Sequence, residues 1–214
     1  MTKLLGISGS LRRGSHNSAL LRAATRLVPP EATLEVAGIR GIPLYDYDIE
    51  VQGLPATVTQ LKDAIVAADG VLLVTPEYNN SIPGVFKNAI DWLSRPSSDI
   101  KRVFGGRPFA VIGASPGSFG TILSQTAWLP VLRTLGTQPW TGGRLMVPRA
   151  ASVFDETGAL KDAAIEEQLR QFLAGYVSFV RRHAAETPAG SVAPAFRPCA
   201  ARAVAACTDT ARSR

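Results

Sequence analysis

The feature that most constrains this chain is an uninterrupted apolar run, Val71-Leu72-Leu73-Val74, bounded by Gly70 and Thr75. A short run without polar alternation is typical of a central strand that is buried on both faces. Such strands belong to parallel sheets whose two faces are covered by helices. The run therefore predicts an α/β fold with a helical layer on each side of the sheet.

Strand and helix patterns alternate along the rest of the chain, as this fold requires. Pro83 is expected to begin a helix, where its missing N–H costs nothing, and Pro130 is expected to kink one. The strands are expected over 4–8, 33–37, 70–75, 108–114 and 144–147, and the helices over 17–28, 54–68, 83–95, 121–135 and 162–183. Five strands and five helices predict a flavodoxin-like, doubly wound five-stranded parallel sheet with helices on both faces.

Length and composition bound the domain organisation. The chain has 214 residues, of which 46% are apolar, and this predicts one domain over 1–183 followed by a disordered Ala/Pro/Arg-rich tail over 184–214. Both cysteines, Cys199 and Cys207, fall in that tail, and the chain has only two histidines. Neither a disulfide framework nor a metal site is therefore expected. No signal peptide or membrane span is visible, so we expect a cytoplasmic protein without a membrane partner.

The net charge bears on the kind of ligand. The formal net charge is +6, and basic proteins of this size often bind nucleic acid. The tail, however, carries four arginines against two acids, and no predicted helix has a stripe of lysine and arginine. The charge therefore favours small anionic ligands over nucleic acid.

Three polar segments follow strands, at the edge of an open α/β sheet where ligands bind. The first, over 9–17, reads Gly-Ser-Leu-Arg-Arg-Gly-Ser-His-Asn and precedes a helix. Helix N-termini attract anions, and arginine forms paired hydrogen bonds with phosphate oxygens. The segment therefore predicts a phosphate site, although it matches neither the Walker nor the Rossmann glycine pattern. An ordinary capped turn, with Ser15 or Asn17 as N-cap, is the alternative.

The second and third segments have the chemistry to flank a flat ring. The second, over 76–84, reads Pro-Glu-Tyr-Asn-Asn-Ser-Ile-Pro-Gly, and the third, over 114–121, reads Ala-Ser-Pro-Gly-Ser-Phe-Gly-Thr. Tyr78 offers an aromatic face beside Glu77 and Asn79, although a turn into a proline-initiated helix would also explain the second segment. The glycines of the third segment would let a ligand approach the backbone.

These segments resemble the motifs of the NADPH-dependent FMN reductase family, which includes bacterial chromate and quinone reductases and azoreductases. The matching residues are Gly9-Ser10-Leu11-Arg12 with Ser15 and Asn17, Pro76-Glu77-Tyr78-Asn79 with 81–84 and 87–92, and Ser115-Pro116-Gly117 with Gly120. The likeness runs from about residue 3 to residue 182, with the motifs in matching order and spacing.

The resemblance implies that FMN is the cofactor. Its phosphate would be held by Ser10, Arg12, Ser15 and Asn17, and its ring would lie against 76–79. Ser115 and Gly117 would meet the other edge of the ring, and three loop neighbours complete the candidate set: His16, Pro116 and Ser118. His16 stands where relatives often have another residue, and it is either a solvated turn residue or a pH-dependent phosphate contact.

The resemblance also implies hydride transfer from NADPH or NADH, through FMN, to a small-molecule acceptor. Quinone, chromate, azo compounds and free flavin are all candidate acceptors, and a homodimer or homotetramer is expected. Because the flavin carries the chemistry, no catalytic side chain is assigned. The alternatives are an electron carrier of the flavodoxin type without nicotinamide turnover, which the basic charge disfavours, and a flavin-free binding module.

Helical spacing in the segment after Pro83 relates Phe86, Ile90, Trp92 and Leu93. This spacing predicts that the four side chains pack in the core. A subunit contact is the alternative for Trp92.

Overall fold

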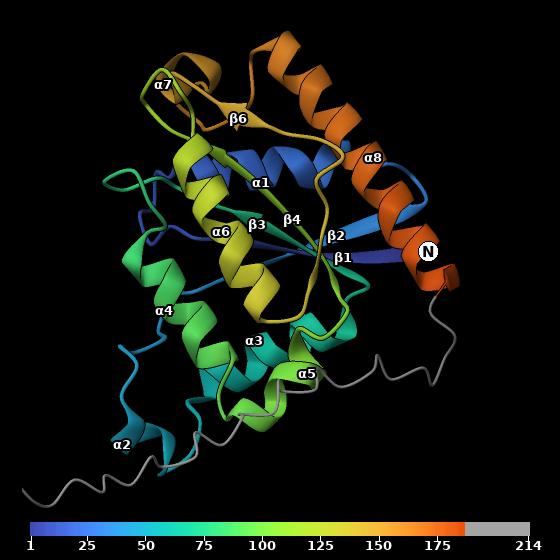
Figure 1. Ribbon diagram of the computed structural model, residues 1–214. Helices are drawn as coiled ribbons and strands as arrows, with labels where there is room; N and C mark the ends of the chain where they lie inside the picture. The colour runs from blue at the N-terminus through green and yellow to red at the C-terminus, as the bar shows by residue number, and fades with distance from the viewer. Residues whose placement is uncertain (187–214) are drawn as a thin grey trace, which may run out of the picture.

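A computed structural model describes residues 1–186 and confirms the parallel α/β architecture (Figure 1). The strand order is β2-β1-β3-β4-β5, and a short β6 also pairs with β4. Every strand pair is parallel. The strands are β1 Thr2–Ser8, β2 Ala32–Gly38, β3 Gly70–Val74, β4 Pro108–Ala114, β5 Gln138–Pro139 and β6 Met146–Val147.

Helices cover both faces of this sheet. One apolar core joins the sheet to α1, α7 and α8, and a second joins it to α3, α4, α5 and α6. The helices are α1 His16–Leu27, α2 Tyr47–Glu50, α3 Ala56–Ala67, α4 Gly84–Leu93, α5 Ile100–Val103, α6 Ile122–Thr134, α7 Ala150–Val153 and α8 Ala163–Glu186, with a 3-10 turn at Ser97–Asp99.

The central strand β3 is buried along its whole length, as its apolar run predicts. Leu72 and Val74 belong to the core under α1 and α8, whereas Val71 and Leu73 belong to the opposite core. Successive side chains point to opposite faces of a strand. Because helices cover both faces, every residue of the run gains the roughly 1.5–3 kcal/mol that burial of a large apolar side chain provides.

Helix α4 packs its apolar stripe into the second core. Phe86, Ile90, Trp92 and Leu93 are all buried, which confirms the core prediction for this spacing. The indole N–H of Trp92 donates to the carbonyl of Pro43 at 2.9 Å. Since the Trp92 side chain is wholly enclosed within the chain, it is not available for a subunit contact.

The edge of the sheet differs from the prediction. A single fifth strand was expected over 144–147, but the edge is divided into β5 and β6, which pair with opposite ends of β4. Pro139 lacks a backbone N–H, and Gly142 and Gly143 follow it, so the chain leaves β4 between the two strands. The short helices α2, α5 and α7 also escaped prediction because one helical turn shows no periodicity.

The C-terminal helix α8 extends to Glu186, three residues beyond its predicted end. Residues 184–186 are therefore helical, and the rest of the predicted tail, with both cysteines, lies outside the described residues. Helix α6 continues through Pro130. Among the helices of residues 1–186, none has the length and apolarity needed to cross a membrane.

Candidate cofactor site

The three polar segments come together at one end of the sheet. They are called here the first loop (9–17), the second loop (76–84) and the third loop (114–121), and they follow the neighbouring strands β1, β3 and β4. The N–H of Gly9 donates to the carbonyl of Val74 at 2.9 Å, and the N–H of Thr75 donates to the carbonyl of Ile112 at 2.8 Å. The strand ends therefore bring the predicted site residues to one edge.

The first loop presents a row of free backbone donors. Within residues 1–186, none of the N–H groups of Ser10, Leu11 or residues 13–16 donates a hydrogen bond to protein. They lie at the N-terminus of α1, where the helix dipole favours negative charge. Arg12 lies over the same loop, with its guanidinium donating to the carbonyl of Gly14. This arrangement fits a phosphate group.

The side chain of Ser15 caps α1. Its hydroxyl accepts hydrogen bonds from the N–H groups of Asn17 at 3.2 Å and Ser18 at 3.3 Å. The capped-turn interpretation therefore describes the hydroxyl of Ser15 correctly. A phosphate at this position would meet the free N–H of Ser15.

The side chain of Asn17 joins the first loop to the third. Its buried amide donates to the carbonyl of Ala114 at 2.8 Å and accepts from the N–H of Ala114 at 2.9 Å. Both polar atoms of the amide are thereby used. We conclude that Asn17 holds two loops in register, a role that the sequence did not indicate.

His16 is half-buried at the first position of α1. Its ring stacks on Phe154, with centroids 5.9 Å apart and planes 18° from parallel. Burial, together with the charge of Arg12, holds the pKa of His16 below its usual value of 6.5. The neutral imidazole is therefore favoured, and the ring is packed rather than solvated.

The second loop is a tight hairpin at its tip. Tyr78 and Ser81 exchange backbone hydrogen bonds at 3.2 and 3.0 Å, and between them Asn79 and Asn80 adopt left-handed backbone with φ of 49° and 61°. Asparagine tolerates this conformation better than most residues. The turn leaves Tyr78 and Asn79 exposed on the rim of the site, while Pro76 before them is buried.

Glu77 connects the second loop to α6. One oxygen of its carboxylate accepts hydrogen bonds from the N–H groups of Leu123 at 2.8 Å and Ser124 at 2.9 Å. The N-cap residue of α6, Thr121, makes no side-chain capping bond of its own. Glu77 therefore caps α6 from 46 residues away, and its charge complements the helix dipole.

Hydrogen bonds hold the third loop in place, one within the loop and one from Arg149. The hydroxyl of Ser115 donates to the carbonyl of Gly120 at 2.5 Å, and the carbonyl of Gly117 accepts from the N–H of Arg149 at 2.9 Å. Gly120 has φ of 64°, and a Cβ there would lie 2.9 Å from Met146. Pro116, Gly117 and Ser118 are exposed. This leaves small side chains at the site, which gives a ring edge room to approach the backbone.

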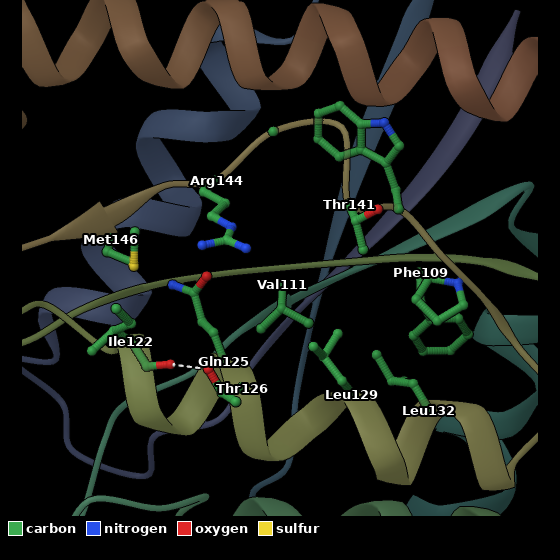
Figure 2. A pocket seen from close by; sticks show the side chains of 13 residues that line it. Phe109, Val111, Ile122, Gln125, Thr126, Leu129, Leu132, Thr141, Arg144 and Met146 are labelled. Atoms are coloured by element: carbon green, nitrogen blue, oxygen red, sulfur yellow. Dashed lines mark hydrogen bonds between the residues drawn. The ribbon is translucent and has the colours of Figure 1, made fainter.

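Two hollows lie beside these loops. A groove of about 390 Å³ lies on the β2 side of the first loop and includes Ser10 and Arg12 in its lining. A smaller hollow of about 90 Å³ lies between α6 and residues 139–146, and Figure 2 shows the side chains that line it. None of the predicted cofactor residues lines this second hollow, and its walls are largely apolar. The predicted chemistry lies with the loops, outside this hollow.

Sequence reasoning missed two residues that shape the site. Arg40, just after β2, donates to the carbonyl of Leu11 and so braces the first loop. Arg149 holds the third loop through its backbone N–H and has a left-handed φ of 48°. Arg40 had a visible signal, because it follows the end of a predicted strand at the ligand-binding edge. Arg149 had no such signal in the sequence.

Within residues 1–186, no cluster of three metal-ligating side chains occurs.

Comparison with known proteins shows to which family this chain belongs. A family model described as NADPH-dependent FMN reductase matches residues 2–152. This chain belongs to that family. An NAD(P)H-dependent FMN reductase of Pseudomonas aeruginosa is 46% identical over 180 residues, covering 84% of this chain and 96% of the relative. A 2-hydroxy-1,4-benzoquinone reductase of Burkholderia sp. is 36% identical over 179 residues, with the same coverage.

A solved structure supports the same family assignment. The flavoenzyme NAD(P)H:(acceptor) oxidoreductase FerB of Paracoccus denitrificans superposes with a TM-score of 0.77 at 32% identity. The match covers 86% of this chain and 99% of FerB. The predicted family, its flavodoxin-like fold and its enzyme class are thus confirmed, with FMN and a nicotinamide as the family's cofactor and co-substrate.

Proposed function

We propose that this NADPH-dependent FMN reductase family member holds FMN in its three loops and passes hydride from NADPH or NADH to a quinone. The observation that carries the proposal is the set of free N–H groups at residues 10, 11 and 13–16, beside the guanidinium of Arg12. These donors suit the phosphate, and the exposed Tyr78 lies one strand away on the β3 side. Bound FMN would supply the redox chemistry, exchanging hydride with a nicotinamide and then with the acceptor.

The chain itself would bind, orient and polarise the cofactor. Ser10, Arg12 and the free N–H groups up to His16 would hold the phosphate. Tyr78 would flank the ring on one side, with the third loop at its edge. Within residues 1–186, the N–H groups of 117–119 donate to no protein acceptor, so they are free to support negative charge that develops on the ring.

Quinone is the proposed acceptor because planar acceptors suit an open ring face with no catalytic side chain. The relative from Burkholderia sp. that is named for a benzoquinone agrees with this choice. The test is a steady-state panel of a benzoquinone, chromate, an azo dye and free flavin, each with NADPH and with NADH. We expect the quinone to give the highest kcat/KM, and a higher value for another acceptor class would overturn the assignment.

The alternative that the sequence left open, an electron carrier without nicotinamide turnover, does not agree with the family to which the chain belongs. One measurement separates a carrier from a reductase, the anaerobic reduction of protein-bound FMN by NADPH or NADH. A reductase bleaches the flavin absorbance within its turnover time, whereas a carrier leaves it oxidised until an electron-donating protein is added. The net charge of +6 favours the reductase, because it attracts anionic nicotinamide substrates.

The phosphate role of Arg12 can be tested separately. Arg12→Ala removes a charge-assisted contact of about 1.5–3 kcal/mol, so the Kd for FMN should rise about 10- to 100-fold. The control is Arg26→Ala, an exposed arginine in the last turn of the same α1. Equilibrium titration of flavin fluorescence measures both. Equal Kd values for the two variants would remove Arg12 from the site.

We also propose that a second copy of the chain covers the loops. Large apolar side chains are exposed around them: Phe119 is 80% exposed, Tyr78 49% and Leu123 45%. They come from the second loop, the third loop and the start of α6, and Glu77 joins the second loop to α6. An apolar rim around a ligand site is typical of an interface that closes the site.

A further inference from the structure

The groove beside the first loop is separated from the ring-flanking loops by β1. Its lining comes from the first loop, from α1 and from the segment 36–40 at the end of β2, whereas the second and third loops lie on the other side, over β3 and β4. The groove and the proposed phosphate site share Ser10 and Arg12 as a common wall. A ligand in the groove would therefore lie next to the cofactor phosphate and away from the flavin ring.

Positive charge dominates this groove. Arg12, Arg13, Arg22 and Arg40 line it, and no aspartate or glutamate does. Within residues 1–186, none of the four arginines forms an ion pair. The guanidinium groups of Arg12 and Arg40 are instead held by carbonyls of the first loop. Even with the cofactor phosphate in place, several guanidinium groups remain without an anion.

The alternation of β2 explains why no acid enters the groove. Leu34 is buried under α1, so Val36 points to the same side and Glu35 to the opposite side. Val36 is 55% exposed, and together with Leu11 it gives the groove an apolar floor. A wall of arginines over an apolar floor suits a ligand that combines a flat base with a phosphate.

We propose that this groove binds the adenosine 2′-phosphate end of NADPH and makes the enzyme prefer NADPH to NADH. The inference rests on the proposed reductase function. Arg40 is the central residue, because it follows the strand next to β1. In Rossmann sheets, whose first loop holds the pyrophosphate of the dinucleotide, an arginine near this strand end accommodates the 2′-phosphate of NADP. Here the first loop would hold the FMN phosphate instead, so the role of Arg40 rests on its place in the arginine-lined wall of the groove.

Arg22 supports the same site from α1. Its guanidinium lies against the turn at Gly158, where an added Cβ would be 2.6 Å from Nη2. Arg22 also lines the groove, and rotation of this long, exposed side chain would bring its charge to a bound phosphate. Arg13 contributes from the first loop.

The test compares two ligands on FMN-loaded protein. Calorimetric titration with adenosine 2′,5′-bisphosphate should show binding that weakens about tenfold in Arg40→Gln and further in Arg22→Gln/Arg40→Gln. Glutamine keeps a donor for the carbonyl of Leu11 while removing the charge. Adenosine 5′-monophosphate should bind more weakly and respond less. Equal affinity for both nucleotides would overturn the 2′-phosphate assignment, as would unchanged affinity in both variants.

Kinetics provide the second measurement. In Arg40→Gln the ratio of kcat/KM for NADPH to kcat/KM for NADH should fall about tenfold, because an effect on the first loop changes both reactions while the loss of a 2′-phosphate contact changes only that of NADPH. Arg26→Ala is the matched control, because this exposed arginine on α1 does not line the groove. Equal changes for both nicotinamides would overturn the proposal. If neither nicotinamide reduces the bound flavin, the proposed function fails, and the calorimetric titration still tests the groove.

Discussion

At the scale of single residues, the most unusual group is Lys62, a lysine that is only 1% exposed. Its ammonium donates to Asp99 at 2.8 Å and to the carbonyl of Arg95. Asp99→Ala would leave this charge buried with one neutral partner and should cost about 3 kcal/mol of unfolding free energy. Lys62→Met should cost less, since Asp99 keeps Arg102 at 3.0 Å. Urea denaturation of both variants checks the order, and a larger loss for Lys62→Met would contradict it.

The same pair predicts a pH dependence of stability. Hydrogen bonds from Arg102 and Lys62 lower the pKa of Asp99 from 3.8 to about 2. A lowered folded-state pKa stabilises the protein above the unfolded-state pKa, and this contribution is lost as the pH falls from about 4 to about 2. Asp99→Asn should therefore be less stable than the native chain near neutral pH, with the difference shrinking over that interval. A constant difference across the interval, measured by urea denaturation, would argue against the ion pair.

The burial of Lys62 also shows what a local pattern cannot reveal. Val58, Leu61 and Ile65, three or four positions apart, form the buried face of α3. Lys62 lies next to that face, but whether it is buried depends on Asp99, which is 37 positions away in sequence. Periodicity reports the direction in which a side chain points. It carries no information on a partner from another element.

At the scale of elements, Glu77 links the second loop to α6, the helix that follows the third loop. Glu77→Ala removes the acceptor for two N–H groups of α6 and should cost about 1 kcal/mol of unfolding free energy. Because the cap also positions the second loop against α6, the Kd for FMN should rise several-fold. Glu77→Gln keeps one acceptor oxygen and should fall between the two.

The matched control for Glu77 is Glu156→Ala, which removes an exposed glutamate outside the three loops. Thermal unfolding and flavin titration measure the two effects. A stability loss at Glu77 without any change in flavin affinity would show that the cap is structural only. The sequence marked Glu77 as a site residue on the strength of its motif, while its capping role needed the contact with α6.

At the scale of the whole molecule, the parts of the fold that could be predicted are the strands and helices that have an apolar pattern in the sequence. The parallel order of β1, β3 and β4 places three sequence-distant loops at one edge, so finding the strands was enough to bring the loops together. The divided edge of β5 and β6 was not predictable in the same way. A strand of two residues has no pattern of its own, and it forms only because β4 offers free ladder positions.

The exposed apolar rim leads to a prediction about assembly. If a second copy covers Phe119, then Phe119→Asp places a charge in an apolar interface and should shift the protein toward monomer. The control is Val66→Asp on α3, which ends just before β3 begins and so lies at the opposite end of the sheet. Size-exclusion chromatography with light scattering gives the mass of each variant. Because the partner would close the flavin pocket, the Phe119→Asp monomer should also release FMN more readily on dilution. A native chain that is monomeric at micromolar concentration would refute the interface, and it would leave the three loops to hold FMN alone.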